Sequence, residues 1–219
     1  MILLHHTPGA CSRVTMTALV QIGLAFEDRP VDIFKGEQRS PAYLAVNPKG
    51  KVPTLEIDCE CLTETPAIIW ALAKRYPDAG LLPATGGEPD IQGLIDLTWI
   101  SNTLHILARA ARVPARLTAG DPEPVRANAL QQLAPILAGL AERLDQSPWW
   151  YGERWSVVDV YLDWVIGMAV GGGGAIDDKP SLVAHAARLR EWPSFQGAVA
   201  REQAALDRSG IVLPGGGKL

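Results

Sequence analysis

A change in sequence pattern at residues 81–89 constrains the fold more than any other feature of the chain. Before this stretch, short apolar runs alternate with segments of helical periodicity, and after it long helical patterns follow with almost no strand signal. Residues 81–89 are rich in Gly, Pro and Ala, a composition typical of a linker. We therefore expect two domains, residues 1–80 and residues 90–219, and 219 residues suffice for both.

The first eighty residues predict a small mixed sheet with helices on both faces. Runs that read as strands occupy residues 2–6, 31–34, 51–57 and 61–62. Helical periodicity covers residues 11–24, a short stretch around Tyr43, and residues 65–75. The last helix begins with Thr65, a good N-cap, and Pro66, which suits the first helical position. The order β-α-β-α-β-β-α predicts a thioredoxin-sized α/β unit.

The second half predicts an all-helical bundle. Helices are expected at residues 91–112, 124–144, 157–170 and 180–190, and another begins at Pro193. Ser156 and Asp159 form a capping box, in which each side chain accepts a hydrogen bond from the other residue's backbone N–H. The helix that follows them is apolar nearly all round, which is typical of the centre of a bundle. His185 is expected at the surface of a late helix.

Charge and cysteine content exclude several classes of function. The chain carries 20 basic and 24 acidic residues without a basic block, so neither nucleic acid nor an anionic membrane is an expected partner. No apolar run approaches the roughly 20 residues that span a bilayer, and the N-terminus lacks the basic stretch of a secretory signal. Three cysteines are too few for a stapled secreted domain, so we expect a cytoplasmic location. Cys59 and Cys61 have no further ligands near them in sequence, so we expect no metal.

The first candidate site is the loop from Thr7 to Ser12. A strand-loop-helix order places the Cys11 and Ser12 side chains near a helix N-terminus, whose partial positive charge favours a thiolate. Alternatively, Cys11 is a small buried residue packed under the sheet. Val14 stands where a Cys-x-x-Cys motif has its second cysteine, so two-cysteine disulfide chemistry is disfavoured.

Two further motifs offer backbone groups and charge to a ligand. Val52-Pro53 stands at a strand start and is a candidate cis peptide bond, which would expose the Val52 backbone N–H and C=O to an extended ligand. The alternative is a simple loop into an edge strand. The unpaired N–H groups of the helix that starts at Thr65 form an anion site, and Glu64 beside it would attract an ammonium group. The alternative here is an ordinary capped helix.

Together these motifs resemble the glutathione S-transferase family in order and spacing. They read Pro-Gly-Ala-Cys-Ser at residues 8–12, Asn-Pro-Lys-Gly-x-Val-Pro at 47–53 and Thr-Glu-x-x-Ala-Ile at 63–68. The cysteine in the first motif makes the chain most similar to the bacterial beta class. The capping box and the helix start at Trp192-Pro193-Ser194 also match, so the resemblance covers essentially the whole chain. Two positions depart from the family pattern: Thr65 stands where Ser or Gly is common, and Thr98 where Asn is common.

The resemblance implies an α/β thioredoxin-like N-terminal domain that binds glutathione and an all-α helical-bundle C-terminal domain on the electrophile side. The residues that it implies for glutathione binding are Lys35, Lys51, Val52, Pro53, Glu64, Thr65 and Asn102. Within this set, the γ-glutamyl end lies at Glu64 and Thr65, the cysteinyl backbone pairs with Val52, and Lys35 contacts the glycyl end. The residues implied for catalysis at the thiol are Cys11, Ser12 and His105. His105 is alternatively a hydrogen-bonded histidine between the two domains.

The activity implied by this resemblance is transfer of glutathione, as the co-substrate, to a small hydrophobic electrophile. Cys11 permits a second chemistry, a mixed disulfide with glutathione in a one-cysteine thiol transferase. The same fold also serves in non-catalytic interaction modules, because fold does not determine function. The resemblance further implies a homodimer.

Overall fold

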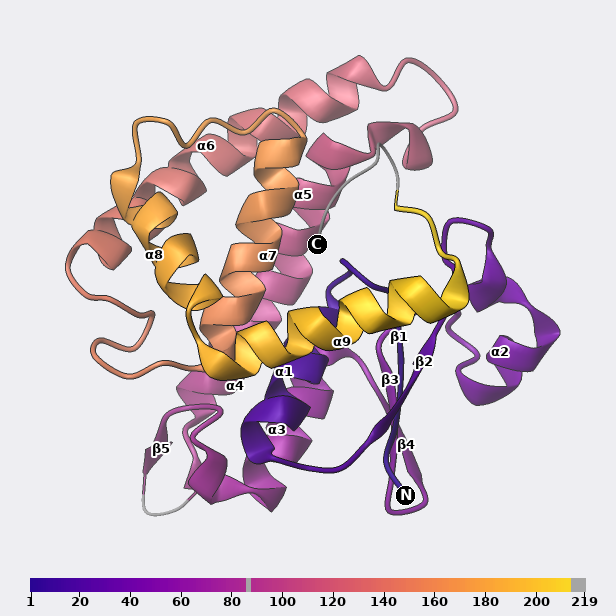
Figure 1. Cartoon of the computed structure of the whole chain (residues 1–219). Helices are drawn as coiled ribbons and strands as arrows, with labels where there is room; N and C mark the ends of the chain where they lie inside the picture. The colour runs from indigo at the N-terminus through magenta and orange to yellow at the C-terminus, as the bar shows by residue number, and fades with distance from the viewer. Residues whose placement is uncertain (86–87, 214–219) are drawn as a thin grey trace. The chain divides into compact units, whose positions relative to one another are not determined.

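A four-stranded mixed sheet is the centre of the first unit of the chain in a computed structural model, which describes residues 1–85 and 88–213 (Figure 1). Its strands are β1 (Leu3–His6), β2 (Glu27–Pro30), β3 (Thr54–Ile57) and β4 (Glu60–Thr63), in the order β2-β1-β3-β4. The strand β1 is parallel to β2 and antiparallel to β3, and β4 returns antiparallel to β3. Leu4 and Leu55 are opposite each other and fully buried, so the apolar runs that predict these strands form the core.

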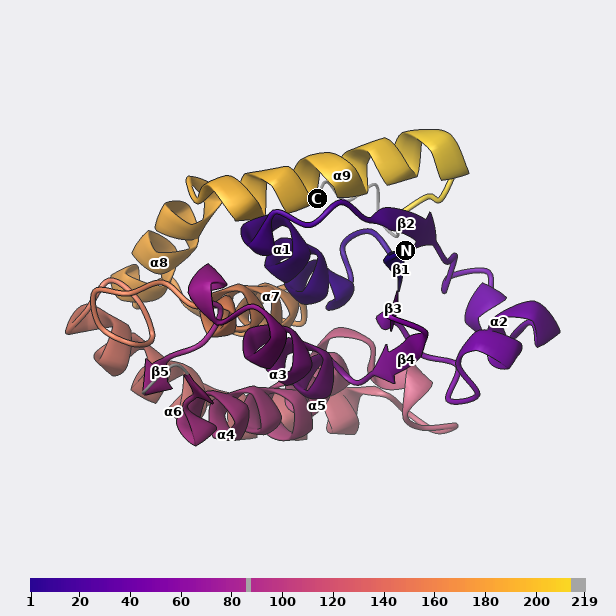
Figure 2. The same ribbon diagram turned by 90° about the horizontal axis from the view of Figure 1, so that it is seen from below.

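Helices cover both sides of this sheet. The helices α1 (Ser12–Ile22) and α3 (Thr65–Arg75) lie side by side on one side, and α2 (Pro41–Val46) lies on the other (Figures 1 and 2). Short 3-10 turns, η1 (Glu37–Arg39) and η2 (Pro77–Ala79), lie in the connections. This arrangement confirms the predicted thioredoxin-like α/β fold.

The predicted second strand is wrong in position. Residues 31–34 are not in a strand: a turn covers residues 33–36, and the strand β2 lies directly before residue 31 at Glu27–Pro30. The physical reason is Asp32, whose carboxylate accepts hydrogen bonds from the backbone N–H groups of Phe34 at 3.0 Å and Lys35 at 3.1 Å. Such local side-chain bonds compete with a strand ladder and turn the chain.

The last helix, α9 (Pro193–Ser209), belongs to this first unit, which comprises Met1–Leu81 and the segment that begins at Trp192. It packs along α1 and reaches β2 (Figure 2). Gly197 permits the close approach, because a Cβ there would lie 2.9 Å from Cγ1 of Val20. The predicted domain boundaries, with Pro193 onward in the second domain, stay a prediction, and residues 214–219 lie outside the described residues.

The second unit, Leu82–Glu191, is mostly helical. It starts with a short hairpin, β5 (Ala84–Thr85) and β6 (Glu88–Pro89), within the predicted linker, of which residues 86 and 87 lie outside the described residues. The helices that follow are α4 (Ile91–Trp99), the π-helical segment η3 (Ile100–Leu104), α5 (His105–Arg112), the 3-10 turn η4 (Pro114–Arg116), α6 (Glu123–Asp145), α7 (Val157–Gly171) and α8 (Pro180–Arg190). They confirm the predicted helices, although the π-helical segment was not predicted.

The predicted capping box starts α7 and organises the core of the second unit. The Asp159 carboxylate accepts the Ser156 backbone N–H at 2.9 Å, and its other oxygen accepts the Trp150 backbone N–H at 2.8 Å. That second oxygen also lies 3.0 Å from Nε2 of His185. His185 is therefore buried, and the expectation of a surface position is wrong because the buried carboxylate recruits it.

The glycine run after α7 lets two helix ends meet backbone to backbone. A Cβ on Gly172 would lie 2.6 Å from the carbonyl carbon of Ala111 and 2.7 Å from the backbone nitrogen of Arg112, so no larger residue fits. The Arg126 guanidinium closes this crossing by donating to the Ala111 carbonyl at 2.7 Å and to the Gly172 carbonyl at 3.3 Å.

Candidate functional site

The loop between β1 and α1 carries both predicted thiol-end residues. Cys11 is the N-cap of α1 and is half-buried, and Ser12 is the first residue of the helix and fully buried. The Ser12 hydroxyl donates to the Thr7 carbonyl at 3.0 Å and accepts the Thr7 backbone N–H at 3.2 Å. A hydroxyl has one proton, and the Ser12 proton is used in the hydrogen bond to Thr7 that joins the two ends of this loop.

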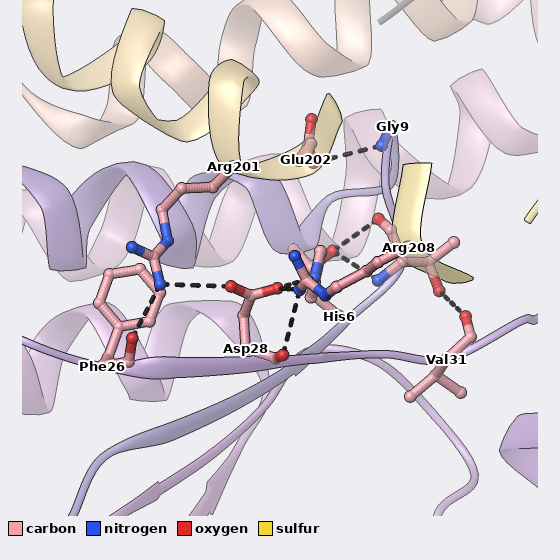
Figure 3. Close-up of polar contacts among 10 residues, drawn as sticks. His6, Gly9, Phe26, Asp28, Val31, Arg201, Glu202 and Arg208 are labelled. Carbon is pink, nitrogen blue, oxygen red and sulfur yellow. Dashed lines mark hydrogen bonds and ion pairs between the residues drawn. The ribbon is translucent and has the colours of Figure 1, made fainter. Parts of the chain in front are cut away.

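A buried ion pair from the C-terminal helix holds the same loop. The Glu202 carboxylate accepts the Gly9 backbone N–H at 3.2 Å (Figure 3). It also accepts Nε–H of Arg13 at 2.8 Å and forms an ion pair with Nη2 of Arg13 at 2.6 Å. Burial raises the pKa of Glu202, and the Arg13 charge opposes that effect only in part. Sequence reasoning missed this pair. The sequence signal for this pair is that Arg13 is the one charged residue of α1, which suggests a buried acidic partner.

A second carboxylate fixes α9 to the sheet. Asp28 on β2 lies between Nε2 of His6 at 3.1 Å, the Arg201 guanidinium at 3.2 Å and Arg208, which also contacts it (Figure 3). Burial raises the pKa of Asp28, but the hydrogen bond and charge of His6 and the charge of Arg208 outweigh burial and lower it below the usual value. Arg201 additionally stacks 3.9 Å from the ring centroid of Phe26. The strand β2 thereby sets the position of the helix that carries the carboxylate on the loop.

The predicted backbone-pairing motif approaches the cysteine. The candidate cis peptide bond at Val52-Pro53 is cis, and the Cys11 Sγ lies 3.8 Å from the Val52 carbonyl oxygen. The buried Asn47 amide holds the preceding turn by donating to the Lys51 carbonyl at 2.9 Å, and the Tyr43 hydroxyl donates to the same oxygen at 2.6 Å. Sequence reasoning did not assign roles to these last two side chains.

The predicted anion site lies at the start of α3. Thr65 is buried as the first helical residue, and Glu64 before it is exposed with a backbone φ of 68°. A non-glycine residue in this region is strained, and such strain is found most often at functional sites. The Glu64 carboxylate pairs with Nζ of Lys49 at 2.9 Å, and Nζ also donates to the Thr63 hydroxyl at 3.0 Å.

The two other predicted lysines are exposed. Lys35 has 77% of its side chain exposed and lies 3.3 Å from the Asp32 carboxylate. Lys51 is also exposed, and its backbone carbonyl, not its ammonium group, takes part in the turn before Val52. The residue that the structure brings to Glu64 is Lys49, which sequence reasoning quoted in the motif but did not single out.

The remaining predicted site residues belong to the second unit. Asn102 is exposed on the π-helical segment η3, and His105 is the first residue of α5. His105 is half-buried, with Nδ1 2.9 Å from the Tyr161 hydroxyl and its ring 4.6 Å from the ring of Trp164. Both of these contacts come from α7, so this helix helps to orient the side chain.

The described part of the chain shows neither a metal-binding group nor a membrane-spanning helix. Within residues 1–85 and 88–213, no three His, Cys, Asp or Glu side chains gather in a way that could hold a metal ion. Every helix in the same residues is too short or too polar to cross a bilayer.

A thioredoxin-like unit whose first loop presents a cysteine at a helix N-terminus defines a class of proteins that handle thiols, and comparison with known proteins identifies the family. The profile described as "Glutathione S-transferase, N-terminal domain" matches residues 1–73. A maleylacetoacetate isomerase of Pseudomonas aeruginosa is 32% identical over 189 residues, 83% of this chain and 87% of that protein. The glutathione S-transferase GstA of Escherichia coli O157:H7 is 30% identical over 201 residues, 91% of this chain and 98% of that protein.

A solved structure agrees with these relatives. A sphingomonad glutathione S-transferase in complex with glutathione is 32% identical, matches 92% of this chain and 98% of its own, and superimposes with a TM-score of 0.80. The chain belongs to the glutathione S-transferase family.

Proposed function

We propose that this chain is a beta class glutathione transferase, which joins the thiolate of glutathione to a small hydrophobic electrophile. The observation that carries the proposal is the contact of 3.8 Å between the Cys11 Sγ and the Val52 carbonyl oxygen. If the cysteinyl backbone of glutathione pairs with Val52, its thiol comes next to Cys11 and the N-terminus of α1. The helix dipole there favours a thiolate, and each pKa unit by which the thiol is lowered corresponds to about 1.4 kcal/mol.

Burial and hydrogen bonding favour Cys11 over Ser12 as the group that faces this thiolate, because the Cys11 thiol donates only a long contact of 3.8 Å to the Val52 carbonyl. The Ser12 hydroxyl proton is engaged by the Thr7 carbonyl, and the side chain is fully buried. Donation to a ligand would break that bond and leave a buried carbonyl without its partner. Cys11 is half-buried and stands at the helix start. Ser12 then acts by shaping the loop.

The charged ends of glutathione have matching groups in the first unit. The γ-glutamyl carboxylate would accept N–H groups at the start of α3 beside Thr65, and its ammonium group would replace Lys49 on the exposed Glu64 carboxylate. The exposed ammonium groups of Lys35 and Lys51 suit the glycyl carboxylate. In the second unit, Asn102 and His105 supply donors for the thiolate or the electrophile.

Calorimetric titration of the full chain with reduced glutathione tests this function, followed by the conjugation rate with a nitro-activated aryl halide. We expect saturable binding in the micromolar to low millimolar range. Cys11→Ala is expected to slow conjugation, and Cys59→Ala, which removes an exposed cysteine outside the site, is the matched control. The absence of heat and of a thermal shift at several millimolar glutathione would refute the transferase and leave a non-catalytic interaction module.

The half-exposed Cys11 thiol favours thiol exchange as a second candidate function. Its thiolate would attack the glutathionyl sulfur of a mixed disulfide and release the other thiol. Reduced glutathione would then attack the Cys11 mixed disulfide, yielding oxidised glutathione and the free thiolate. Cys11→Ser would abolish this exchange, and an unchanged exchange rate would exclude Cys11. Likeness to the maleylacetoacetate isomerase supports one further assay, isomerisation of maleylacetoacetate in the presence of glutathione.

We also propose a homodimer and a cytoplasmic location, where the reducing environment keeps Cys11 a thiol. An exposed apolar stripe on α4 and η3 supports the dimer, because such patches mark protein contacts. It is a shallow groove lined by Ile91, Leu94, Ile95, Thr98, Trp99 and Asn102. Ile95→Glu should convert a dimer to a monomer in sedimentation equilibrium, and an unchanged mass would exclude this face as the contact.

A further inference from the structure

The helical segment before His105 is π-helical, and this widened turn sets where His105 points. The segment Ile100–Leu104 interrupts the α-helical pattern that α4 starts and α5 resumes. Such turns are rare in α-helices and are frequently found at functional sites. Because the π-helical segment ends directly before His105, it indicates that His105 has a functional role that depends on its orientation.

Two aromatic side chains from α7 hold the His105 ring. Tyr161 and Trp164 are three residues apart and so lie on the same face of that helix. The Tyr161 hydroxyl lies 2.9 Å from Nδ1 of His105, and the Trp164 ring meets the His105 ring edge to face at 4.6 Å and 67°. Tyr161 has 1% of its surface exposed, so its hydroxyl is fixed by packing.

The chemistry of the two groups decides which atom donates in this hydrogen bond. A phenol O–H is a stronger acid than the N–H of a neutral imidazole, and an imidazole nitrogen is a stronger base than a phenol oxygen. The favoured bond thus runs from the Tyr161 O–H to Nδ1 of His105. A neutral imidazole has one ring proton, which is then on Nε2.

We propose that Tyr161 is a positioning residue that fixes neutral His105 as the Nε2–H tautomer, so that His105 offers an N–H donor to an anionic ligand atom. This role deepens the proposed transfer and rests on it, since the anion is the glutathione thiolate or the charge that develops on the electrophile. The other tautomer would present a lone pair to that negative charge and weaken its binding.

Nitrogen NMR of the full chain with 15N-labelled histidine reads the tautomer directly, in buffer alkaline enough to keep imidazole neutral. The chain has four histidines, and His105→Gln identifies the resonances of His105. We expect a protonated Nε2 and an unprotonated Nδ1 in the wild type. In Tyr161→Phe, which removes one oxygen atom, we expect a mixture of tautomers and a kcat about three- to tenfold lower, with the KM for glutathione little changed.

Tyr151→Phe is the matched control for losing a tyrosine hydroxyl in the same unit. The Tyr151 hydroxyl donates to the Asp96 carboxylate at 2.6 Å and does not take part in the His105 contact. This variant is expected to leave both the tautomer and kcat unchanged. A tautomer shift of equal size in both variants would overturn the specific role of Tyr161.

Two substitutions at position 105 give a readout that needs no variant at Tyr161. The amide nitrogen of glutamine reaches about as far as Nε2 of histidine, and that of asparagine about as far as Nδ1. His105→Gln is thus expected to retain more turnover than His105→Asn, and the reverse order would overturn the proposal.

The NMR result also separates this inference from the proposed function. A proton on Nδ1 in the wild type, or an unchanged tautomer in Tyr161→Phe, refutes the role of Tyr161 even in an active transferase. A tautomer that shifts as expected in a protein without glutathione binding supports the Tyr161 contact and refutes the transferase.

Discussion

The buried pair of Glu202 and Arg13 gives the sharpest test of how the thiol loop is held. Glu202→Gln keeps a carbonyl oxygen for the Gly9 backbone N–H but removes the negative charge that faces the Arg13 guanidinium. It also turns a carboxamide N–H towards the guanidinium, where two donors meet. Glu202 has no exposed surface and the Arg13 side chain is 11% exposed, so water can replace the lost partner only to a small extent.

The expected cost follows from leaving one charge buried alone. Removing one partner of a buried ion pair costs about 3–5 kcal/mol, most of it the desolvation of the remaining charge. Because Arg13 retains slight contact with water, we expect the lower end, about 3 kcal/mol in the free energy of unfolding. With a urea dependence of about 2–3 kcal/mol/M for a chain of this size, the urea midpoint should fall by about 1–1.5 M at an unchanged slope.

A double variant separates stability from positioning. Arg13→Met with Glu202→Leu replaces the pair by apolar side chains of similar volume, an exchange that is often neutral or stabilising in other proteins. We expect the urea midpoint to recover, while conjugation stays slow because the Gly9 backbone N–H has lost its acceptor. The reasoning is refuted if Glu202→Gln unfolds within about 0.5 kcal/mol of the wild type, a shift typical of surface substitutions. It is also refuted if the double variant regains full activity.

Two further substitutions test the packing and the acid stability. Gly172→Ala should lower the free energy of unfolding by about 2–3 kcal/mol, because its Cβ meets the Ala111 and Arg112 backbone. In thermal unfolding, Gly139→Ala in α6 is the control, since its Cβ would meet no atom within 4 Å and should stabilise by up to about 1 kcal/mol. The lowered pKa of Asp28 means that its stabilisation is complete above the usual value of 3.8 and is lost as pH falls through the folded-state value. Asp28→Asn should therefore be less stable near neutral pH and lose less on acidification to about pH 3, and urea midpoints that fall in parallel with the wild type would contradict this.

Local chemistry explains which parts of the fold the sequence predicts well. The helix from Thr65 to Arg75 has the predicted bounds, because Pro66 marks its start within a few residues of sequence. The predicted N-cap is wrong, because Glu64 is the N-cap and Thr65 is the first helical residue. The capping box of Ser156 and Asp159 is predicted for the same reason. The prediction of a strand at residues 31–34 is wrong because it rests on apolar periodicity alone. That pattern does not show that the Asp32 carboxylate accepts hydrogen bonds from the backbone N–H groups of Phe34 and Lys35.

Long-range contacts explain what the sequence does not predict at the site. Short sequence motifs identify Cys11, Val52 and Glu64. The groups that hold these residues in place lie elsewhere in the sequence and belong to no such motif. The expectation of His185 at the surface is wrong because the sequence of its own helix does not indicate its hydrogen bond to Asp159, which lies 26 residues earlier. Glu202 follows Gly9 by 193 residues, and no local pattern links an acidic residue in the last helix to a loop near the first strand.

The position of Glu202 depends in turn on a residue that does not touch the loop. Asp28 binds Arg201 and Arg208, which stand on either side of Glu202 in the sequence of α9, so this carboxylate fixes the helix along its axis and in rotation (Figure 3). A helix held at two points seven residues apart cannot shift by a turn without breaking both contacts. Glu202 is thereby placed to accept the Gly9 backbone N–H. The loop before α1 is then held by two contacts, this one from α9 and the hydrogen bond from the Ser12 hydroxyl to the Thr7 carbonyl. The geometry around Cys11 is therefore set by an acidic residue on β2 acting through the last helix of the chain, and a substitution at Asp28 should disturb the thiol loop even though the two are not in contact.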